Sequence, residues 1–525
     1  MQINRREALI WSAATLLATT RSSLAQGRRT IRIAPHAALR VLDPVTTSAY
    51  ITRNHAYMVY DTLFSIDAAY RPQPQMVKEW TVSDDQLSYT FTLREGLLFH
   101  DNRPVTAEDC VASITRWAKK DVVGLRLASA MSDIRPLDDK TFRIALKTPF
   151  GPTLEAMARP SSIPLFVMPR RIAELPPDKP LEEVVGSGPF RFIASDFRPG
   201  VSWAYERFAD YVPRAEPPDG LAGGKVVKVD RVEALWFPSK QTAINALAKG
   251  EIDLLENMNA DQRSLLDGDR GVTLRRRFGP MASTIRFNWA QPPFDNLKAR
   301  QAVQAVVTQQ DYMDASIGDP KSYQICPALF GCGTQLEVDD GFRDTGKPDV
   351  KTARALLKES GYKGEKVVII TPGDIASFAP LAPLTQQLLQ QIGMASEIQT
   401  MEWSAFLARR AKPGPVSEGG WNIAHAVFDR LDLISPLGNP NFDARGKSGY
   451  SGFVDDPETT DLKNQYERAT DPARQKAIAA ELQKRAYDLV FYIPLGTYYD
   501  YEAFRSNVTG YVPAPVMVMW GVTKA

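Results

Sequence analysis

The chain is poor in histidine and cysteine, the residue types that most often hold transition metals in proteins. Its 525 residues include four histidines and three cysteines. His36, His55, His100 and His425 lie far apart, and no two of them have the i, i+4 spacing of a helical metal site. A zinc or nickel centre built by the protein alone is therefore not expected, and the sequence predicts no metal and no other cofactor.

An excess of either charge is also missing. The chain has 63 Lys and Arg residues against 61 Asp and Glu, which gives a formal net charge of +2. Proteins that bind nucleic acid usually need a strongly basic face, so nucleic acid is not an expected partner. With 44% apolar and 24% charged residues the composition is that of a packed globular protein, and the length predicts about two to four domains.

Catalytic sequence motifs are absent as well. No G-x-S-x-G nucleophile motif occurs. Residues 341–348, GFRDTGKP, imitate a phosphate-binding loop, but Pro348 stands where Ser or Thr must reach magnesium. We therefore expect no catalysis. A secreted hydrolase stays open only as an alternative, because it would need a nucleophile–base pair or a metal site.

Apolar runs long enough to span a bilayer are not found. The apolar run at residues 8–18 is well short of the ~20 residues that a spanning helix needs. Arg5-Arg6 precedes it, and small residues follow at the −3 and −1 positions of a cleavage site after residue 25. This order predicts a cleaved secretory signal at 1–25 and a soluble mature protein in the periplasm. The arginine pair fits either a twin-arginine signal or an ordinary secretion signal.

Two of the three cysteines are close in sequence. Cys326 and Cys332, in CPALFGCG, are able to close a small loop in an oxidising compartment, and Pro327 and Gly331 suit a tight loop. The alternative is two free thiols. Cys110 lies on an expected helix and is predicted to pack as a small hydrophobic residue.

Hydrophobic periodicity predicts a mixed α/β fold. Residues 88–94 alternate as a half-buried strand, 97–100 is expected to be a second short strand, and Thr106 with Asp109 forms a capping box that begins a helix. From about residue 225 onward, helices that end at glycine alternate with strands, which is typical of βα units with buried sheets.

Three segments mix aromatic residues with Asp, Arg and Asn. They are WNIAHAVFDRLD, NFDARGKSGYSGF and TYYDYEAF. Most single aromatic residues belong to a core. The functional interpretation is a cleft that stacks an organic solute and binds its charged ends.

The stretch LSYTFTLREGLLFHDNRPVTAEDCVASITRW at 87–117 closely resembles the signature region of the family 5 extracellular solute-binding proteins. These are the peptide-, nickel- and opine-type receptors of bacterial ABC importers. GSGPFRF at 186–192, IRFNWAQPPFDNLKARQAVQAVVTQQDYM at 285–313 and DVKTARALLKESGY at 349–362 are similar to other segments of the family, in the same order. The resemblance covers essentially the whole chain after the signal.

The resemblance implies a type II periplasmic binding protein fold, in which two α/β lobes close about a hinge over a buried ligand. The implied boundaries are a first lobe at 28–283, with an extra subdomain at 71–186, a second lobe at 284–491, and a return to the first lobe at 492–525. The implied partners are a small-molecule ligand and the ABC transporter permease in the inner membrane, and the protein is expected to be a monomer.

The resemblance also implies a binding site. In peptide-binding relatives an aspartate that follows an aromatic position in the second lobe pairs with the ligand amine. Here Phe428 takes the aromatic position and Asp432 the anchor position, with Asp429 as the competing anchor. Arg430 suggests an acidic group on the ligand.

Three further residues complete the implied site, namely Tyr50 and Arg53 from the first lobe and Trp403 as a floor. The sequence thus predicts a periplasmic receptor that delivers a small organic solute, such as a peptide, an opine or an amino-acid-like compound, to an ABC transporter. An orphan receptor that signals to a chemoreceptor is the second alternative, beside the hydrolase.

Overall fold

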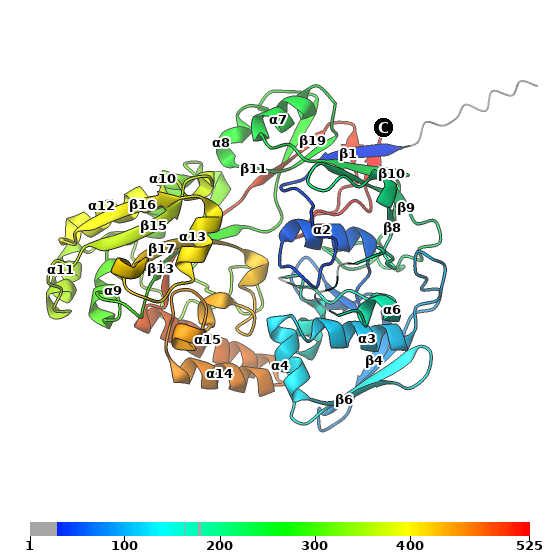
Figure 1. Ribbon diagram of the computed structural model, residues 1–525, viewed down its shortest axis with the longest axis horizontal. Coiled ribbons are helices and arrows are strands. Elements are labelled where there is room, and N and C mark those ends of the chain that lie inside the picture. Colours follow the sequence, from blue (N-terminus) through cyan, green and yellow to red (C-terminus); the bar gives the residue numbers. More distant parts are fainter. Residues whose placement is uncertain (1–28, 162, 177–178, 180) are drawn as a thin grey trace, which may run out of the picture.

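The computed structural model describes residues 29–161, 163–176, 179 and 181–525. The signal expected at 1–25 lies outside the described residues. The described chain forms two lobes, joined where the chain crosses from one to the other (Figure 1). No helix in the described part of the chain combines the length and the apolar character needed to cross a membrane.

The first lobe is built on a seven-stranded sheet in the order β12-β19-β11-β1-β10-β9-β8. Its centre is parallel, because β1 pairs in the same direction with β10 and β11. The strands are β1 (Thr30–Ala34), β8 (Phe190–Phe192), β9 (Ser202–Arg207), β10 (Arg231–Leu235), β11 (Leu254–Met258), β12 (Val272–Arg276) and β19 (Tyr501–Arg505). The helices of this lobe are α2 (Tyr50–Val59), α5 (Thr153–Ala158), α6 (Arg170–Ala173), α7 (Lys240–Ala248) and α8 (Ala260–Arg263). Two small two-stranded sheets complete it, namely β2 (Phe64–Ile66) with β3 (Pro72–Pro74) and β20 (Val508–Thr509) with β21 (Thr523–Lys524).

A separate antiparallel sheet, β4-β5-β7-β6, falls inside the range predicted for the extra subdomain. Tyr89, Phe91 and Leu93 of β5 are buried and alternate with half-buried neighbours, so the period-2 prediction is confirmed. The helix start is confirmed too, since the backbone N–H of Thr106 donates to Asp109 at 2.9 Å. The elements are β4 (Val77–Val82), β5 (Ser88–Leu93), β6 (Met131–Pro136), β7 (Thr141–Leu146), α3 (Ala107–Trp117) and α4 (Val122–Ala130).

The strand expected at 97–100 does not form. β5 has its two neighbours in β4 and β7, so no place beside it is left for the segment that follows. Leu98 makes only an isolated bridge to Pro104. The prediction was wrong because a local turn signal does not show which distant strand pairs with the second edge of β5, and here that strand is β7.

The second lobe has a six-stranded sheet in the order β14-β18-β13-β17-β15-β16. The helix–glycine–strand units are confirmed, and α12, for example, ends at Gly393 in the left-handed conformation with φ 92°. The strands are β13 (Met281–Phe287), β14 (Tyr323–Gln324), β15 (Val367–Pro372), β16 (Ser396–Met401), β17 (Ile423–Asp429) and β18 (Tyr492–Tyr498). The helices are α9 (Leu297–Gln304), α10 (Gln309–Ser316), α11 (Val350–Glu359), α12 (Leu381–Ile392), α13 (Trp403–Arg410), α14 (Pro457–Arg468) and α15 (Pro472–Leu489).

Two crossings form the hinge, at 277–280 between β12 and β13 and at 499–500 between β18 and β19. They lie side by side, because the backbone N–H of Arg277 donates to the carbonyl of Asp500 at 2.8 Å. The sequence predicted the crossings at 284 and 492. Strand pairing moves both boundaries, since β13 begins at Met281 and pairs along its length with β17 and with β18 in the second lobe.

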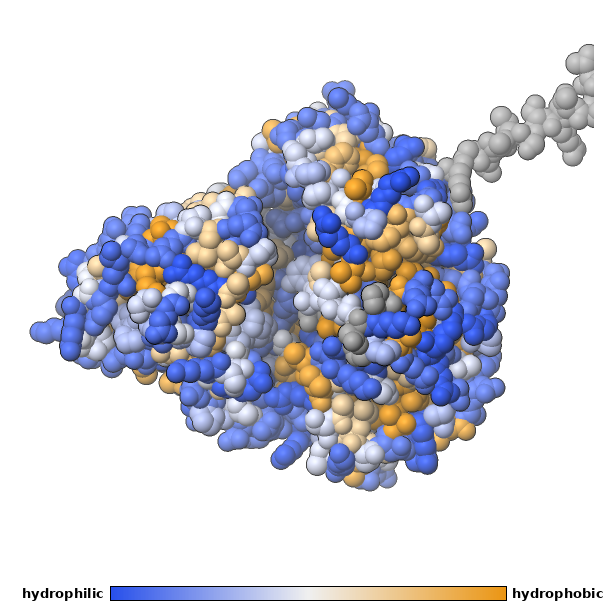
Figure 2. Space-filling view, viewed as in Figure 1, coloured by the Kyte–Doolittle hydropathy of each residue, from blue (hydrophilic) through white to orange (hydrophobic). Residues whose placement is uncertain are grey.

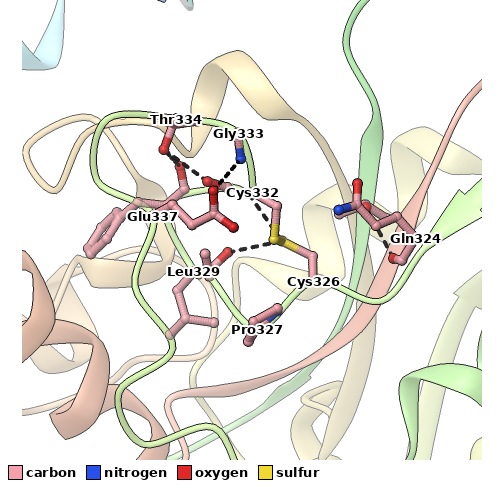
Figure 3. The surroundings of a disulfide bond; sticks show 12 residues. Gln324, Cys326, Pro327, Leu329, Cys332, Gly333, Thr334 and Glu337 are labelled. Carbon is pink, nitrogen blue, oxygen red and sulfur yellow. Dashed lines mark hydrogen bonds between the residues drawn. A yellow bond between two sulfur atoms is a disulfide. The ribbon is translucent and has the colours of Figure 1, made fainter.

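The structure joins Cys326 to Cys332 in a disulfide (Figure 3). Gly331 has φ 93°, a conformation that glycine adopts without a Cβ clash, and this lets the short loop close. Buried Gln309 holds Cys326 in place, since its side chain exchanges hydrogen bonds of 2.8 and 2.9 Å with the Cys326 backbone. The third cysteine, Cys110, is free and fully buried.

Thiol counting checks this pairing. We expect no reactive thiol in the native protein, because burial shields Cys110 and raises its pKa. Denatured, unreduced protein should show one thiol, and denatured, reduced protein three. Three thiols before reduction would contradict the disulfide.

A buried carboxyl group lies beside the hinge. Glu502 in β19 is 4% exposed and accepts a hydrogen bond from the Tyr511 hydroxyl at 2.9 Å. Burial raises the pKa of Glu502 to about 7, well above the ~4.3 of an unfolded chain. The folded state therefore binds the proton more tightly than the unfolded state does.

This difference predicts a pH-dependent stability. Between about pH 4.3 and 7 the folded protein holds more protons than the unfolded chain at this residue, so its free energy of unfolding falls as the pH rises. Glu502→Gln removes the titration and keeps the acceptor for Tyr511. The melting temperature of Glu502→Gln should lie above that of wild type at neutral pH, and the difference between the two should increase from pH 4.5 to pH 7.5. Exposed Glu251→Gln is the matched control, and an identical pH profile for Glu502→Gln and wild type would contradict the prediction.

Candidate functional site

A cleft of about 730 Å³ opens between the two lobes. Figure 2 shows the surface hollowed between the two halves of the molecule. The first lobe lines the cleft with Thr47, Ser48, Ala49, Tyr50, Val122 and Arg159, and the second lobe with Trp403, Leu407, Arg410, Ala426, Val427, Phe428, Asp432, Gly438, Pro440 and Tyr450. Four of the six residues predicted for the site, Tyr50, Trp403, Phe428 and Asp432, are among them.

Asp432 lies where the two lobes meet. It follows the carboxyl end of the central strand β17, in a short 3₁₀ turn at Arg430–Asp432. Its two carboxylate oxygens accept hydrogen bonds from the hydroxyl groups of Tyr50 and Ser161, both in the first lobe. Burial and the nearby negative charge of Asp429 raise the pKa of Asp432, while the two hydrogen bonds oppose that rise. A cation beside it would stabilise the ionised form.

Asp429, the competing anchor, is used elsewhere. It is 1% exposed, and its carboxylate accepts from Arg277 in the first hinge crossing at 2.8 Å and from the backbone N–H of Leu431 at 3.1 Å. Asp429 therefore ties the turn to the hinge and does not line the cleft. This arrangement favours Asp432 as the anchor.

The two remaining predicted residues lie outside the cleft lining. Arg53 is buried behind Tyr50, with its guanidinium carbon 4.6 Å from the ring centroid, so it supports that ring. Arg430 points the other way, into a separate cavity of about 30 Å³ that Cys326 and Gly331 also line. The structure thus does not bring Arg430 to the place where a ligand acid was expected.

A different arginine takes the position beside the cleft. Arg410, at the end of α13, is buried and stacks on Phe406 and Tyr450, and it donates to the Tyr450 hydroxyl at 3.1 Å. No carboxylate lies within ion-pair distance of Arg410 among the described residues. Its charge is therefore free to meet an anionic or carbonyl oxygen of a ligand.

Sequence reasoning missed Ser161, Arg410 and Tyr450. Tyr450 lies in NFDARGKSGYSGF, one of the segments that mix aromatic and charged residues, so a signal for it existed. Ser161 and Arg410 carry no local signal, since only the tertiary fold brings Ser161 to Asp432 and Arg410 to the cleft. The segment TYYDYEAF instead forms the second hinge crossing.

Over the described ranges, no three His, Cys, Asp or Glu side chains are grouped so that they could hold a metal ion. The arrangement in the cleft is one carboxylate, one unpaired guanidinium and several aromatic rings. It suits binding of an organic solute through charge and stacking.

Comparison with known proteins identifies the family. The sequence model described as "Bacterial extracellular solute-binding proteins, family 5 Middle" matches residues 71–430. The chain belongs to this family. This chain is therefore an extracellular solute-binding protein of the kind that serves ABC transporters.

Individual relatives agree with the family 5 assignment. A "Probable peptide ABC transporter periplasmic-binding protein y4tO" of Sinorhizobium fredii is 38% identical over 508 residues, which cover 95% of this chain and 94% of the relative. The ABC transporter substrate-binding protein CtaP of Listeria monocytogenes matches with a TM-score of 0.79 at 21% identity, covering 94% of this chain and 99% of the other.

A third relative is AgaA from A. tumefacien R10, solved in complex with agropinic acid. It has a TM-score of 0.75 at 21% identity, with 94% of this chain and 99% of the other covered. These comparisons support neither the hydrolase nor the orphan signalling receptor.

Proposed function

We propose that this family 5 protein binds a small organic solute with an ammonium group, of the peptide, opine or amino-acid type, and delivers it to an inner-membrane permease as a monomer without catalysis. The observation that carries the proposal is the position of Asp432. It belongs to the second lobe, faces the cleft, and is held by Tyr50 and Ser161 of the first lobe. The 38% identical relative is named for peptides, which supports this solute class.

An ammonium group fits the remaining capacity of Asp432. A carboxylate has about four acceptor positions, and the hydroxyl groups of Tyr50 and Ser161 use two of them. A bound ammonium group completes the set with charge-assisted hydrogen bonds and compensates for the burial of the carboxylate. Trp403, Phe428 and Tyr450 then supply flat apolar surfaces for the body of the solute.

Closure of the lobes follows from where these groups reside. A solute that touches Asp432 and Arg410 on one lobe and Tyr50 on the other makes its full set of contacts only when the cleft is closed. Binding therefore shifts the population toward the closed form by the difference in affinity between the two forms. The closed form is the one we expect the permease to read.

Asp432→Asn tests the anchor. The substitution keeps the size of the side chain and one acceptor oxygen, but it removes the charge. We expect an ammonium-bearing solute to bind about 2–5 kcal/mol more weakly, while the melting temperature of the unliganded protein changes little. The measurement is a thermal-shift screen of peptides, opines and amino-acid conjugates, followed by titration calorimetry of the solutes that bind.

Exposed Asp461→Asn on α14 is the control for the loss of one negative charge in the same lobe. It should leave affinity unchanged. The proposal fails if Asp432→Asn lowers the melting temperature of the unliganded protein but binds the same solute with unchanged affinity, because Asp432 is then only a contact between the lobes.

We also propose that residues 1–25 are removed during export. The expected result is a periplasmic protein whose mature N-terminus, determined by Edman sequencing or mass spectrometry, lies near Gln26. Replacing Arg5 and Arg6 by lysine distinguishes the routes, since a twin-arginine substrate should stall in the cytoplasm and an ordinary secreted protein should not. Full-length protein in the cytoplasm of wild-type cells would count against export.

A further inference from the structure

The cleft continues into a second compartment. This compartment has a volume of about 390 Å³ and shares four lining residues with the main cleft, namely Val122, Gly438, Pro440 and Tyr450. Like the main cleft, it lies between the lobes, with α4 on one side and the segment before α14 on the other. The two spaces therefore adjoin, with these four residues at their boundary.

One wall of the second compartment is apolar and exposed. Val122 and Leu125 of α4 are 52% and 49% exposed, and both line this compartment. In Figure 2 an apolar patch borders the hollow at the place where Figure 1 shows α4. Leu437 and Phe442 of the second lobe line the same compartment. An apolar segment between these two walls would remove exposed hydrocarbon surface from water.

The charges around the compartment are paired, with one exception. Arg126 binds Glu467 at 2.7 Å across the lobes, and Arg445 binds Asp443 at 2.7 Å. Lys463 has no carboxylate within 4.0 Å among the residues that the structure describes. Lys463 is therefore the cation in this compartment that remains available to pair with an anionic ligand.

Lys463 is also buried. Its side chain is on a residue only 7% exposed, and its Nζ donates to the carbonyl oxygen of Phe442 at 3.0 Å. An ammonium group has three donors, so further donors remain for an oxygen ligand. Burial, followed by the positive charge of Arg126, lowers the pKa of Lys463 to about 8. An unpaired cation in such a place is costly unless an anion joins it.

We propose that the second compartment holds the distal end of the transported solute, with an apolar segment against Val122 and Leu125 and a terminal carboxylate on Lys463. The inference rests on the proposed function, because the other end of the solute is the ammonium group at Asp432. It specifies an extended solute with an apolar body and opposite charges at its ends, as in a short peptide with a free C-terminus. Since Leu125 and Lys463 belong to different lobes, the distal end also favours closure.

The test uses alanyl-leucyl peptides of two to five residues, each as the free acid and as the C-terminal amide, titrated by calorimetry. Wild-type protein should bind the free acid of its preferred length about tenfold or more tighter than the amide. Lys463→Met keeps the aliphatic stem and should bind acid and amide alike. Lys463→Arg should restore the preference, and exposed Lys476→Met on α15 should keep it in full.

Two more variants locate the carboxylate and the apolar segment. Arg410→Met should weaken acid and amide by the same factor, because Arg410 lies in the main cleft. Leu125→Ser, at an exposed position that leaves the core intact, should weaken leucine-containing peptides relative to alanine-only peptides of equal length. The unliganded melting temperature of each variant shows that it is folded.

Three results would overturn the inference: Lys463→Met keeps the wild-type ratio of acid to amide, Arg410→Met abolishes that ratio, or peptides longer than two residues bind no better than dipeptides. N-acetylated peptides distinguish failure of the distal site from failure of the proposed function. If acetylation does not lower the affinity, the proposed pairing of an ammonium group with Asp432 is wrong. The role of Lys463 is still tested, because it is measured as the ratio of free-acid to amide affinity. If no peptide binds wild-type protein, the peptide-like solute and its distal site both fail.

Discussion

The ion pair between Arg277 and Asp429 is the interaction on which the site depends. Arg277 belongs to the first hinge crossing, and Asp429 ends the central strand of the second lobe. Asp429 is buried and the Arg277 side chain is only 14% exposed, so removing Arg277 would leave a buried, uncompensated carboxylate at a cost of about 3–5 kcal/mol. The pair holds the short turn that follows β17, and three residues later this turn presents Asp432 to the first lobe. Hinge and cleft are therefore connected through four consecutive residues.

The lobes meet through polar contacts beside the cleft and through an apolar cluster that both lobes share. Asp432 meets two hydroxyl groups, and Arg126 with Glu467 forms an ion pair at the far end of the groove. Polar contacts of this kind exchange readily with water, so each is worth about 0.5–1.5 kcal/mol net. A solute that bridges the cleft adds contacts that favour the closed form. Two apolar clusters lie within one lobe each, whereas the largest cluster includes residues of both lobes, such as Phe91 of the first and Leu482 of the second.

Local patterns in the sequence were reliable where neighbouring residues decide the structure. The alternation of Tyr89, Phe91 and Leu93, the capping box at Thr106 and the disulfide loop at Cys326 all depend on residues a few positions apart. The strand expected at 97–100 and the hinge boundary at 492 failed because they depend on which distant strand supplies a partner. Pairing between strands that are hundreds of residues apart cannot be recognised from the local sequence of either strand.

Hydrophobic periodicity in the sequence indicated a mixed α/β fold, and the resemblance to family 5 implied the two lobes and four residues of the cleft lining, because the segments that carry the resemblance are properties of the chain. Only the tertiary structure separated Asp432 from Asp429, since one carboxylate faces the cleft and the other is consumed by Arg277. It likewise turned Arg430 away and placed Arg410 and Lys463 along the groove. The physical reason is that a charged side chain acquires its role from the partners around it, and those partners come from segments that meet only when the lobes fold and pack.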